Sequence, residues 1–251
     1  MKLIGLSNLG NTCYINSVLQ CFIYNKDFHE LINESNEINL KELIKIVNDE
    51  PGNFNLNSFV SSFKNFKRHE QQDAHEFISA LLDLIKDTHH YYHGQTKTTN
   101  LCSCCKTVKD NFEDFNSINL NVNVSITESF KVYLSSEIQN DPNNLYFCDV
   151  CNSQQISKKK ISLNILPKNL IIVLKRYNHD NFKDIETILK IKENETIKTY
   201  NLKSIINHIG SMNYGHYTTS INGIIIDDNT VSRNNRSFTE NGAYILFYSV
   251  E

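Results

Sequence analysis

The hydrophobic pattern of this 251-residue chain changes its period near residue 95, and this change restricts the possible folds more than any other feature. Before it, apolar residues recur at helical spacing, most clearly over 74–85, where one stripe repeats at i, i+3, i+4, i+7, i+8 and i+11. Two further helices are expected, one after Cys13 and one over 40–47 that ends at Pro51-Gly52. After residue 95, alternating segments at 108–112 and 118–122 indicate strands. Helices followed by strands predict an α+β fold.

The second part of the chain is expected to form a mainly antiparallel sheet. Strands are predicted over 161–165 and 170–174, separated by Pro167, which is tolerated at the start or the edge of a strand. Two more are predicted over 217–226 and 244–250, and a short helix over 127–135. Side chains of the helical part and of the strands that act together must therefore meet in a cleft between two lobes.

Composition excludes several classes of function. The net charge of −3 is too small to favour nucleic acid or a membrane surface, and the basic run 158–160 is interpreted as a solvated strand face. No apolar run approaches the roughly 20 residues that cross a bilayer, and the N-terminus has no signal-peptide core. We therefore expect an intracellular protein, cytoplasmic or nuclear. Seven cysteines in such a chain argue against a disulfide framework.

Cys13 is the candidate nucleophile. It follows Gly10 closely and begins an apolar helix, where unpaired backbone N–H groups and the helix dipole favour the reactive thiolate. A buried structural cysteine is the alternative, and Cys21, eight residues further along the same helix, fits that description better.

His216 is the candidate general base. It alone among the nine histidines follows a glycine, and glycine permits close approach of another backbone, here that of a substrate. His208 is the main competitor. Asp227 or Asp228 would orient the imidazole, and the choice stays open because adjacent strand residues face opposite sides and the register is unknown.

Two Cys-x-x-Cys pairs predict a structural zinc site. Cys102 and Cys105 form the first pair and Cys148 and Cys151 the second, and four thiolates fill a tetrahedral zinc shell. Cys104 leaves open a different register in the first pair. The metal would stabilise a finger that has little core of its own.

Five segments, in order, resemble the ubiquitin-specific proteases, a family of deubiquitinating cysteine proteases. The first is Gly5–Gln20, similar to the family's cysteine box. The others are Gln71–Phe77, the two cysteine pairs, Leu166-Pro167 with Leu174–Tyr177, and Gly215–Tyr217 through Ala243–Tyr248. The resemblance covers nearly the whole chain. It implies one catalytic domain over 1–251 with papain-like lobes: a helical thumb over 1–94 and a β-rich palm and fingers over 95–251, with the zinc finger at about 100–155.

The resemblance also implies roles for further residues. It favours Asp227 over Asp228 as the third catalytic member, and it makes Asn8 an oxyanion-stabilising side chain, with Asn11 as a second candidate and a turn role as the alternative. Asp73 and Glu76, three apart on one helix, would hold ubiquitin's basic C-terminal tail, unless they only stabilise the helix N-terminus. Tyr214 and Tyr217 would line the channel for the terminal Gly-Gly.

The function predicted from these residues is a cysteine isopeptidase that cleaves after the C-terminal glycine of ubiquitin. A protease for another ubiquitin-like modifier and a non-catalytic ubiquitin-binding module are the alternatives. We expect ubiquitin and ubiquitinated proteins as partners, no cofactor besides structural zinc, and a monomeric chain. Compared with the family, only 37 residues separate Tyr177 from Gly215, and Gly223–Ile226 stands where an aromatic residue is often found. Loops that cover the ubiquitin tail are therefore expected to be short.

Overall fold

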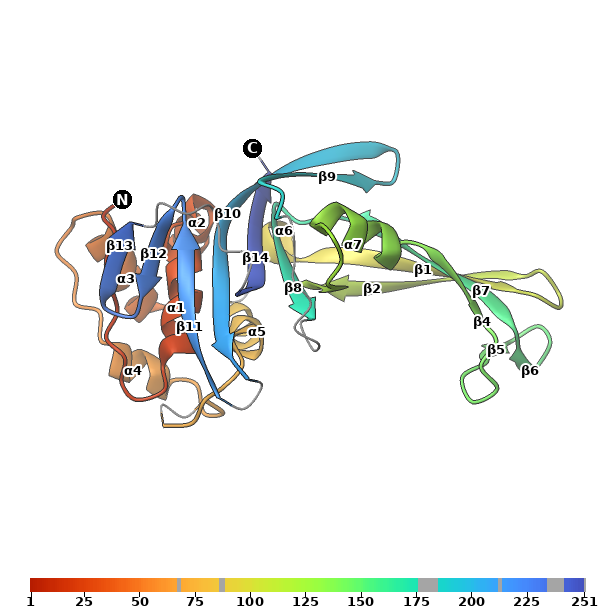
Figure 1. Cartoon of the computed structure of the whole chain (residues 1–251), viewed down its shortest axis with the longest axis horizontal. Helices are drawn as coiled ribbons and strands as arrows, with labels where there is room; N and C mark the ends of the chain where they lie inside the picture. Colours follow the sequence, from red (N-terminus) through yellow and green to blue (C-terminus); the bar gives the residue numbers. More distant parts are fainter. Residues whose placement is uncertain (67–68, 86–88, 176–184, 212–213, 234–241, 251) are drawn as a thin grey trace.

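The computed structural model describes residues 1–66, 69–85, 89–175, 185–211, 214–233 and 242–250 (Figure 1). Its helices lie mostly in the first third of the chain and its strands follow from residue 94, which confirms the α+β prediction. The helices are α1 (Cys13–Ile23), α2 (Lys26–Glu34), α3 (Ile38–Val47), α4 (Leu56–Ser61), α5 (Ala74–Ile85), α6 (His89–Tyr92) and α7 (Ile126–Tyr133). Within the described residues, no helix is both long enough and apolar enough to span a bilayer.

The central sheet has the strand order β13-β12-β11-β10-β14-β8-β3, with β9 paired to β10. All of these pairs are antiparallel except β3 with β8. The strands are β3 (Ile118–Asn121), β8 (Asn169–Lys175), β9 (Ile188–Glu193), β10 (Thr196–Gly210), β11 (Gly215–Ile221), β12 (Ile224–Asp227), β13 (Thr230–Arg233) and β14 (Ala243–Val250). This order places the strand that carries His216 beside the strand that carries Asp227.

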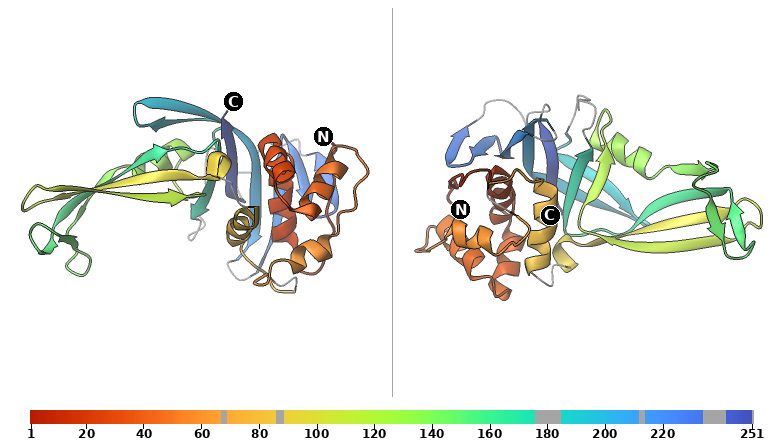
Figure 2. Two further views of the ribbon diagram at one scale, coloured as in Figure 1. Left: turned by 180° about the vertical axis from the view of Figure 1, so that it is seen from behind. Right: turned by 90° about the horizontal axis from the view of Figure 1, so that it is seen from below.

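The two faces of the sheet bury two separate hydrophobic clusters. Along β8, Ile171 and Val173 pack with the helices, whereas Leu170, Ile172 and Leu174 pack on the opposite side with α7. This alternation is the period-2 pattern of a strand buried on both faces. Figure 2 shows α1 to α5 gathered on one face of the sheet. One layer of strands therefore holds together the helices and the second core.

A second sheet forms an arm that extends away from the helices (Figures 1 and 2). Its order is β2-β1-β7-β4, and the small hairpin β5-β6 lies at its tip. The strands are β1 (Gly94–Cys102), β2 (Val108–Phe115), β4 (Ser136–Gln139), β5 (Tyr146–Cys148), β6 (Ser153–Gln155) and β7 (Ser157–Ile165). Every residue of β2 is at least partly exposed, so the arm has little apolar core near its tip.

Several predicted elements differ from the observed ones. The single strand predicted over 217–226 is wrong: Asn222 and Gly223, with φ of 48° and 77°, turn the chain between β11 and β12. Asn-Gly is the sequence typical of a two-residue hairpin turn, because both residues tolerate positive φ. The helix predicted over 127–135 begins and ends slightly earlier, as α7. Arg176 and Tyr177, part of the resembling segments, lie outside the described residues.

Candidate active site

Cys13 is the first residue of α1 and is 4% exposed. Burial raises the pKa of its thiol, and the nearby Asp228 carboxylate raises it further, while a hydrogen bond from the Tyr217 backbone lowers it. The helix N-terminus had predicted a thiolate. In this conformation, burial works against the thiolate that the helix N-terminus favours.

His216 and Asp227 form a close pair across neighbouring strands. Asp227 Oδ1 lies 2.6 Å from His216 Nε2, and the two side chains are 49% and 42% exposed. The pairing of β11 with β12 brings them together. Among the described residues, no hydrogen bond joins Cys13 Sγ to His216. Catalytic hydrogen bonds are often long or poorly aligned before substrate binds, so this does not exclude the pair from catalysis.

Asp228 makes different contacts from its neighbour. Its carboxylate accepts hydrogen bonds from Asn8 Nδ2 at 2.9 Å and from Asn16 Nδ2 at 2.7 Å. Its backbone carbonyl accepts from the Leu6 N–H at 2.8 Å. Asp228 therefore ties the loop before Cys13 to the end of β12. Sequence reasoning missed Asn16, whose signal was its place on the same face of α1 as Cys13, three residues on.

The Asn8 side chain makes hydrogen bonds through both its oxygen and its nitrogen. Its Oδ1 accepts from the backbone N–H groups of Gly10 and Thr12, at 3.0 and 3.2 Å, while its Nδ2 faces Asp228. Both the turn role and the position beside Cys13 are therefore present. The Asn11 amide instead donates to the His69 carbonyl at 2.8 Å.

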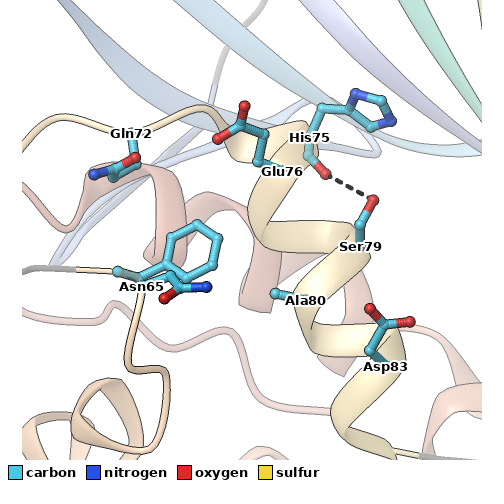
Figure 3. A pocket seen from close by; sticks show the side chains of 8 residues that line it. Asn65, Gln72, His75, Glu76, Ser79, Ala80 and Asp83 are labelled. Atoms are coloured by element: carbon cyan, nitrogen blue, oxygen red, sulfur yellow. Dashed lines mark hydrogen bonds between the residues drawn. The ribbon is translucent and has the colours of Figure 1, made fainter.

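The predicted acidic pair on α5 is divided between two environments. The Asp73 carboxylate accepts from Tyr244 Oη at 2.9 and 2.8 Å and from the His75 N–H at 2.7 Å, so Asp73 caps the helix and anchors β14. Glu76 is exposed and lines a cavity of about 420 Å³ between α5 and the segment around Phe66 (Figure 3). Asp83 lines the same cavity. The carboxylates available to a basic ligand are thus those of Glu76 and Asp83.

The two predicted channel tyrosines also differ. Tyr214 is 78% exposed. Tyr217 is half-buried, its ring centroid lies 4.5 Å from that of His208, and burial raises the pKa of its hydroxyl. His208, the competing histidine, packs beneath Gly215: a Cβ at Gly215 would lie 2.0 Å from His208 Nε2. Any larger residue before His216 would therefore require the imidazole of His208 to move.

Four cysteines cluster at the tip of the arm. The Sγ atoms of Cys102 and Cys151 are 3.9 Å apart, those of Cys105 and Cys148 are 3.5 Å apart, and all four lie within 4.8 Å of one another. Tetrahedral zinc with Zn–S bonds of about 2.3 Å requires sulfurs roughly 3.8 Å apart, so the cluster fits this metal. Cys104 is exposed and outside the cluster. The four residues could therefore hold a metal ion.

Comparison with known families decides what kind of protein carries this arrangement. The family profile described as "Ubiquitin carboxyl-terminal hydrolase" matches residues 4–248. The chain belongs to this family. The resemblance to ubiquitin-specific proteases is thereby confirmed, as is the predicted class, a thiol-dependent deubiquitinating hydrolase.

Individual relatives of this hydrolase support the same assignment. It is 26% identical over 335 residues to ubiquitin carboxyl-terminal hydrolase 8 of Saccharomyces cerevisiae, covering 99% of this chain and 70% of the relative. It is 30% identical to ubiquitin carboxyl-terminal hydrolase 26 of Arabidopsis thaliana, covering 86% of this chain but 24% of that protein. The hydrolase thus spans most of one relative and about a quarter of the other.

Solved structures extend the match to three dimensions. The hydrolase aligns with Ubp8 in the SAGA DUB module bound to monoubiquitin, with a TM-score of 0.81 and 26% identity, over 99% of this chain and 69% of Ubp8. The same module bound to ubiquitin aldehyde gives a TM-score of 0.80 and 25% identity, over 99% and 70%. The predicted two-lobe fold, with thumb, palm and fingers, is confirmed by these matches.

Proposed function

We propose that this hydrolase cleaves the bond after the C-terminal glycine of ubiquitin, with Cys13 as nucleophile. The observation that carries the proposal is the convergence of three elements. The Cys13 thiol, at the start of α1, lies beside the Tyr217 backbone of β11, and the neighbouring His216 is paired with Asp227. An acyl-transfer enzyme of the thiol class requires a nucleophile, a base and a group that orients the base.

The proposed reaction has two stages. His216 takes the proton from Cys13 Sγ, the sulfur attacks the glycine carbonyl carbon, and His216 then gives that proton to the departing amine as the C–N bond breaks. Water, deprotonated by His216, attacks the resulting thioester and releases the glycine carboxylate and the thiol. Asp227 stabilises the imidazolium throughout. Substrate binding must first bring His216 into line with the buried thiol.

The oxyanion of each tetrahedral intermediate would be stabilised by Asn8 Nδ2 and the Cys13 backbone N–H. Asn8 Nδ2 donates to Asp228 in the resting enzyme and has a second N–H for the oxyanion. Asp228 thus acts as a positioning residue for Asn8, and Asp227 as the partner of His216.

We further propose that Glu76 contacts the basic tail of ubiquitin, while Asp73 supports this contact by holding the start of α5. Tyr214, which is exposed, is the proposed wall of the tail channel, with Tyr217 behind it. Ubiquitin conjugates are then the partners. A monomeric chain stays a prediction, to be checked by light scattering.

The four clustered cysteines are proposed to bind one structural zinc ion, which leaves no coordination position for a substrate. Zinc would hold the tip of the arm in place. The chemistry itself would be performed by Cys13, which lies 89 positions before Cys102 in the sequence. A free nucleophilic thiol and four reduced ligands need a reducing compartment, so we propose the cytoplasm or the nucleus. We treat residues 1–251 as one catalytic domain, with the thumb over 1–94 and the palm and fingers over 95–251.

The first experiment is incubation of the zinc-loaded protein with ubiquitin that carries a thiol-reactive C-terminal group. A covalent adduct is expected with the parent chain and with Cys21→Ala, because the Cys21 thiol is buried away from the site, but not with Cys13→Ala. Parallel probes built on other ubiquitin-like modifiers separate the alternative substrate. If only one of those probes forms an adduct, that modifier and not ubiquitin is the substrate. Binding of a probe without any adduct would indicate the non-catalytic module.

A further inference from the structure

The segment over 69–73 crosses the candidate site and is fixed at alternate residues to three other parts of the chain. The His69 carbonyl accepts from Asn11, beside the cysteine, and Asp73 accepts from Tyr244 on β14. Between them, the Gln71 side chain makes two hydrogen bonds to the backbone of Gly215: Nε2 donates to the Gly215 carbonyl at 3.1 Å, and the Gly215 N–H donates to Oε1 at 3.0 Å. Gln71 therefore satisfies both backbone groups of the residue before His216.

The two bonds lie on an open edge of β11. On its inner side β11 pairs with β10 over 215–220, but its pairing with β12 begins only at Thr219. The Ser211 N–H donates to the Tyr214 carbonyl in the hairpin, so Gly215 and Tyr217 direct their backbone groups away from β10, as alternate residues of an antiparallel strand do. Tyr217 meets the Cys13 thiol at this edge and Gly215 meets Gln71.

This arrangement has a direct consequence for any extended substrate. Two residues of a strand span about 6.6 Å, so the Gln71 amide sits about that far along the edge from the contact with the nucleophile. A chain whose carbonyl reaches Cys13 along this edge would pair its own N–H and C=O with Gly215, which is strand addition to a sheet edge. The primary amide of Gln71 gives one donor and one acceptor to Gly215. It therefore occupies the place that a peptide group of the substrate would take.

We propose that Gln71 is a resting-state latch: its side chain holds the strand-pairing groups of Gly215 until the extended tail of the substrate displaces it. The inference rests on the proposed function and adds to it a step of regulation at the same site. Gln71 is exposed, so water competes for both bonds and the latch opens readily. Only the form in which Gln71 has released Gly215 accepts the tail. The latch therefore multiplies the apparent KM by the inverse of the fraction of molecules in that open form.

The test compares the zinc-loaded parent chain with Gln71→Ala and Gln71→Asn, whose amide is one methylene too short to reach Gly215 in the same way. With a ubiquitin substrate, both variants are expected to lower KM roughly fivefold, the ratio that corresponds to one net hydrogen bond, with kcat unchanged. A second readout uses [15N]glycine labelling, which gives only eight signals. Exchange of the Gly215 amide with D₂O should be faster in both variants, and the amides of Gly52 and Gly94 serve as internal controls.

Iodoacetamide is the control for the thiol itself, because it needs no extended tail. It should modify Cys13 at equal rates in the parent and the variants. A KM that stays the same or rises in the variants, or unchanged exchange at Gly215, would overturn the latch. If neither the parent nor the variants hydrolyse the ubiquitin substrate, the proposed function is wrong, and the latch proposal fails with it.

Discussion

Asp228 holds two amide groups of the cysteine loop at once, and this contact separates its role from that of Asp227. Its φ of 48° places it in the left-handed region, where the chain turns after β12 and redirects its side chain towards Asn8 and Asn16. Asp227, still in the strand, points to His216. The sequence left the two acids open because both the register and this turn depend on the paired strands, which no short motif specifies.

We predict that Asp228→Ala and Asn8→Ala lower kcat to a similar extent, on the order of tenfold to a hundredfold, and that the double variant is no worse than either single one. Removing either partner disrupts the same hydrogen bond, so the effects are coupled by about 1–3 kcal/mol. Asp227→Ala should be the matched contrast, because it acts on His216 and not on Asn8. The factor by which it lowers kcat should therefore multiply with the factor for Asn8→Ala. Ubiquitin hydrolysis measured through this double-mutant cycle checks the prediction. Multiplicative effects of Asp228→Ala and Asn8→Ala would contradict it.

Cys13 shows a different limit of sequence reasoning at the same scale. Its place at a helix start is predicted from the residues around it, but its burial is not. Burial depends on Tyr217 and the β11 backbone, some two hundred positions away, and it raises the pKa of the thiol.

At the scale of elements, the strongest periodic segments were predicted well and the polar ones were missed. The stripe over 74–85 coincides with α5, because its apolar face is specified locally. The fifteen residues of β10 were not predicted, since its outer half over 196–201 mixes Lys, Thr and Asn and is stabilised by pairing with β9. The cysteine pairs, by contrast, carry their geometry in their spacing, and the structure brings all four together at the tip of the arm.

We predict that the parent chain binds one zinc ion and that Cys148→Ser loses it, whereas Cys104→Ser, the matched control at an exposed cysteine outside the cluster, retains it. Without the metal, the hairpin β5-β6 has almost no buried apolar surface to hold it. Amide exchange over 146–155 should therefore rise by about a hundredfold or more, while α1 stays protected. Metal analysis by mass spectrometry and hydrogen exchange measure both effects. Zinc loss from Cys104→Ser, or protection of the tip without metal, would contradict this assignment.

At the scale of the whole molecule, the central sheet packs against both the helices and the second core, and we expect the helical and β-rich parts to unfold as one cooperative unit. Successive residues of β14 enter opposite cores: Phe247 packs against Phe22 of α1, with ring centroids 5.4 Å apart, while Leu246 and Tyr248 face the cluster around α7. The site depends on this unit, because Cys13 is carried by the helices and His216 by the sheet. A change at the sheet–helix contact should thus destabilise both lobes together.

Phe247→Ala is predicted to lower the free energy of unfolding by about 3–5 kcal/mol, since it leaves a cavity where a ring now packs edge-on against Phe22. Phe112→Ala removes the same atoms from a position on the arm that is 53% exposed, and it should cost less than about 1 kcal/mol. Urea unfolding followed by circular dichroism, which reports the helices, and by hydrogen exchange of β8, which reports the sheet, gives both values. If the two lobes are one unit, both probes shift by the same amount in Phe247→Ala. If the helices unfold at a lower urea concentration than the one at which β8 loses its exchange protection, the thumb unfolds independently. The sheet would then not couple the nucleophile to its base.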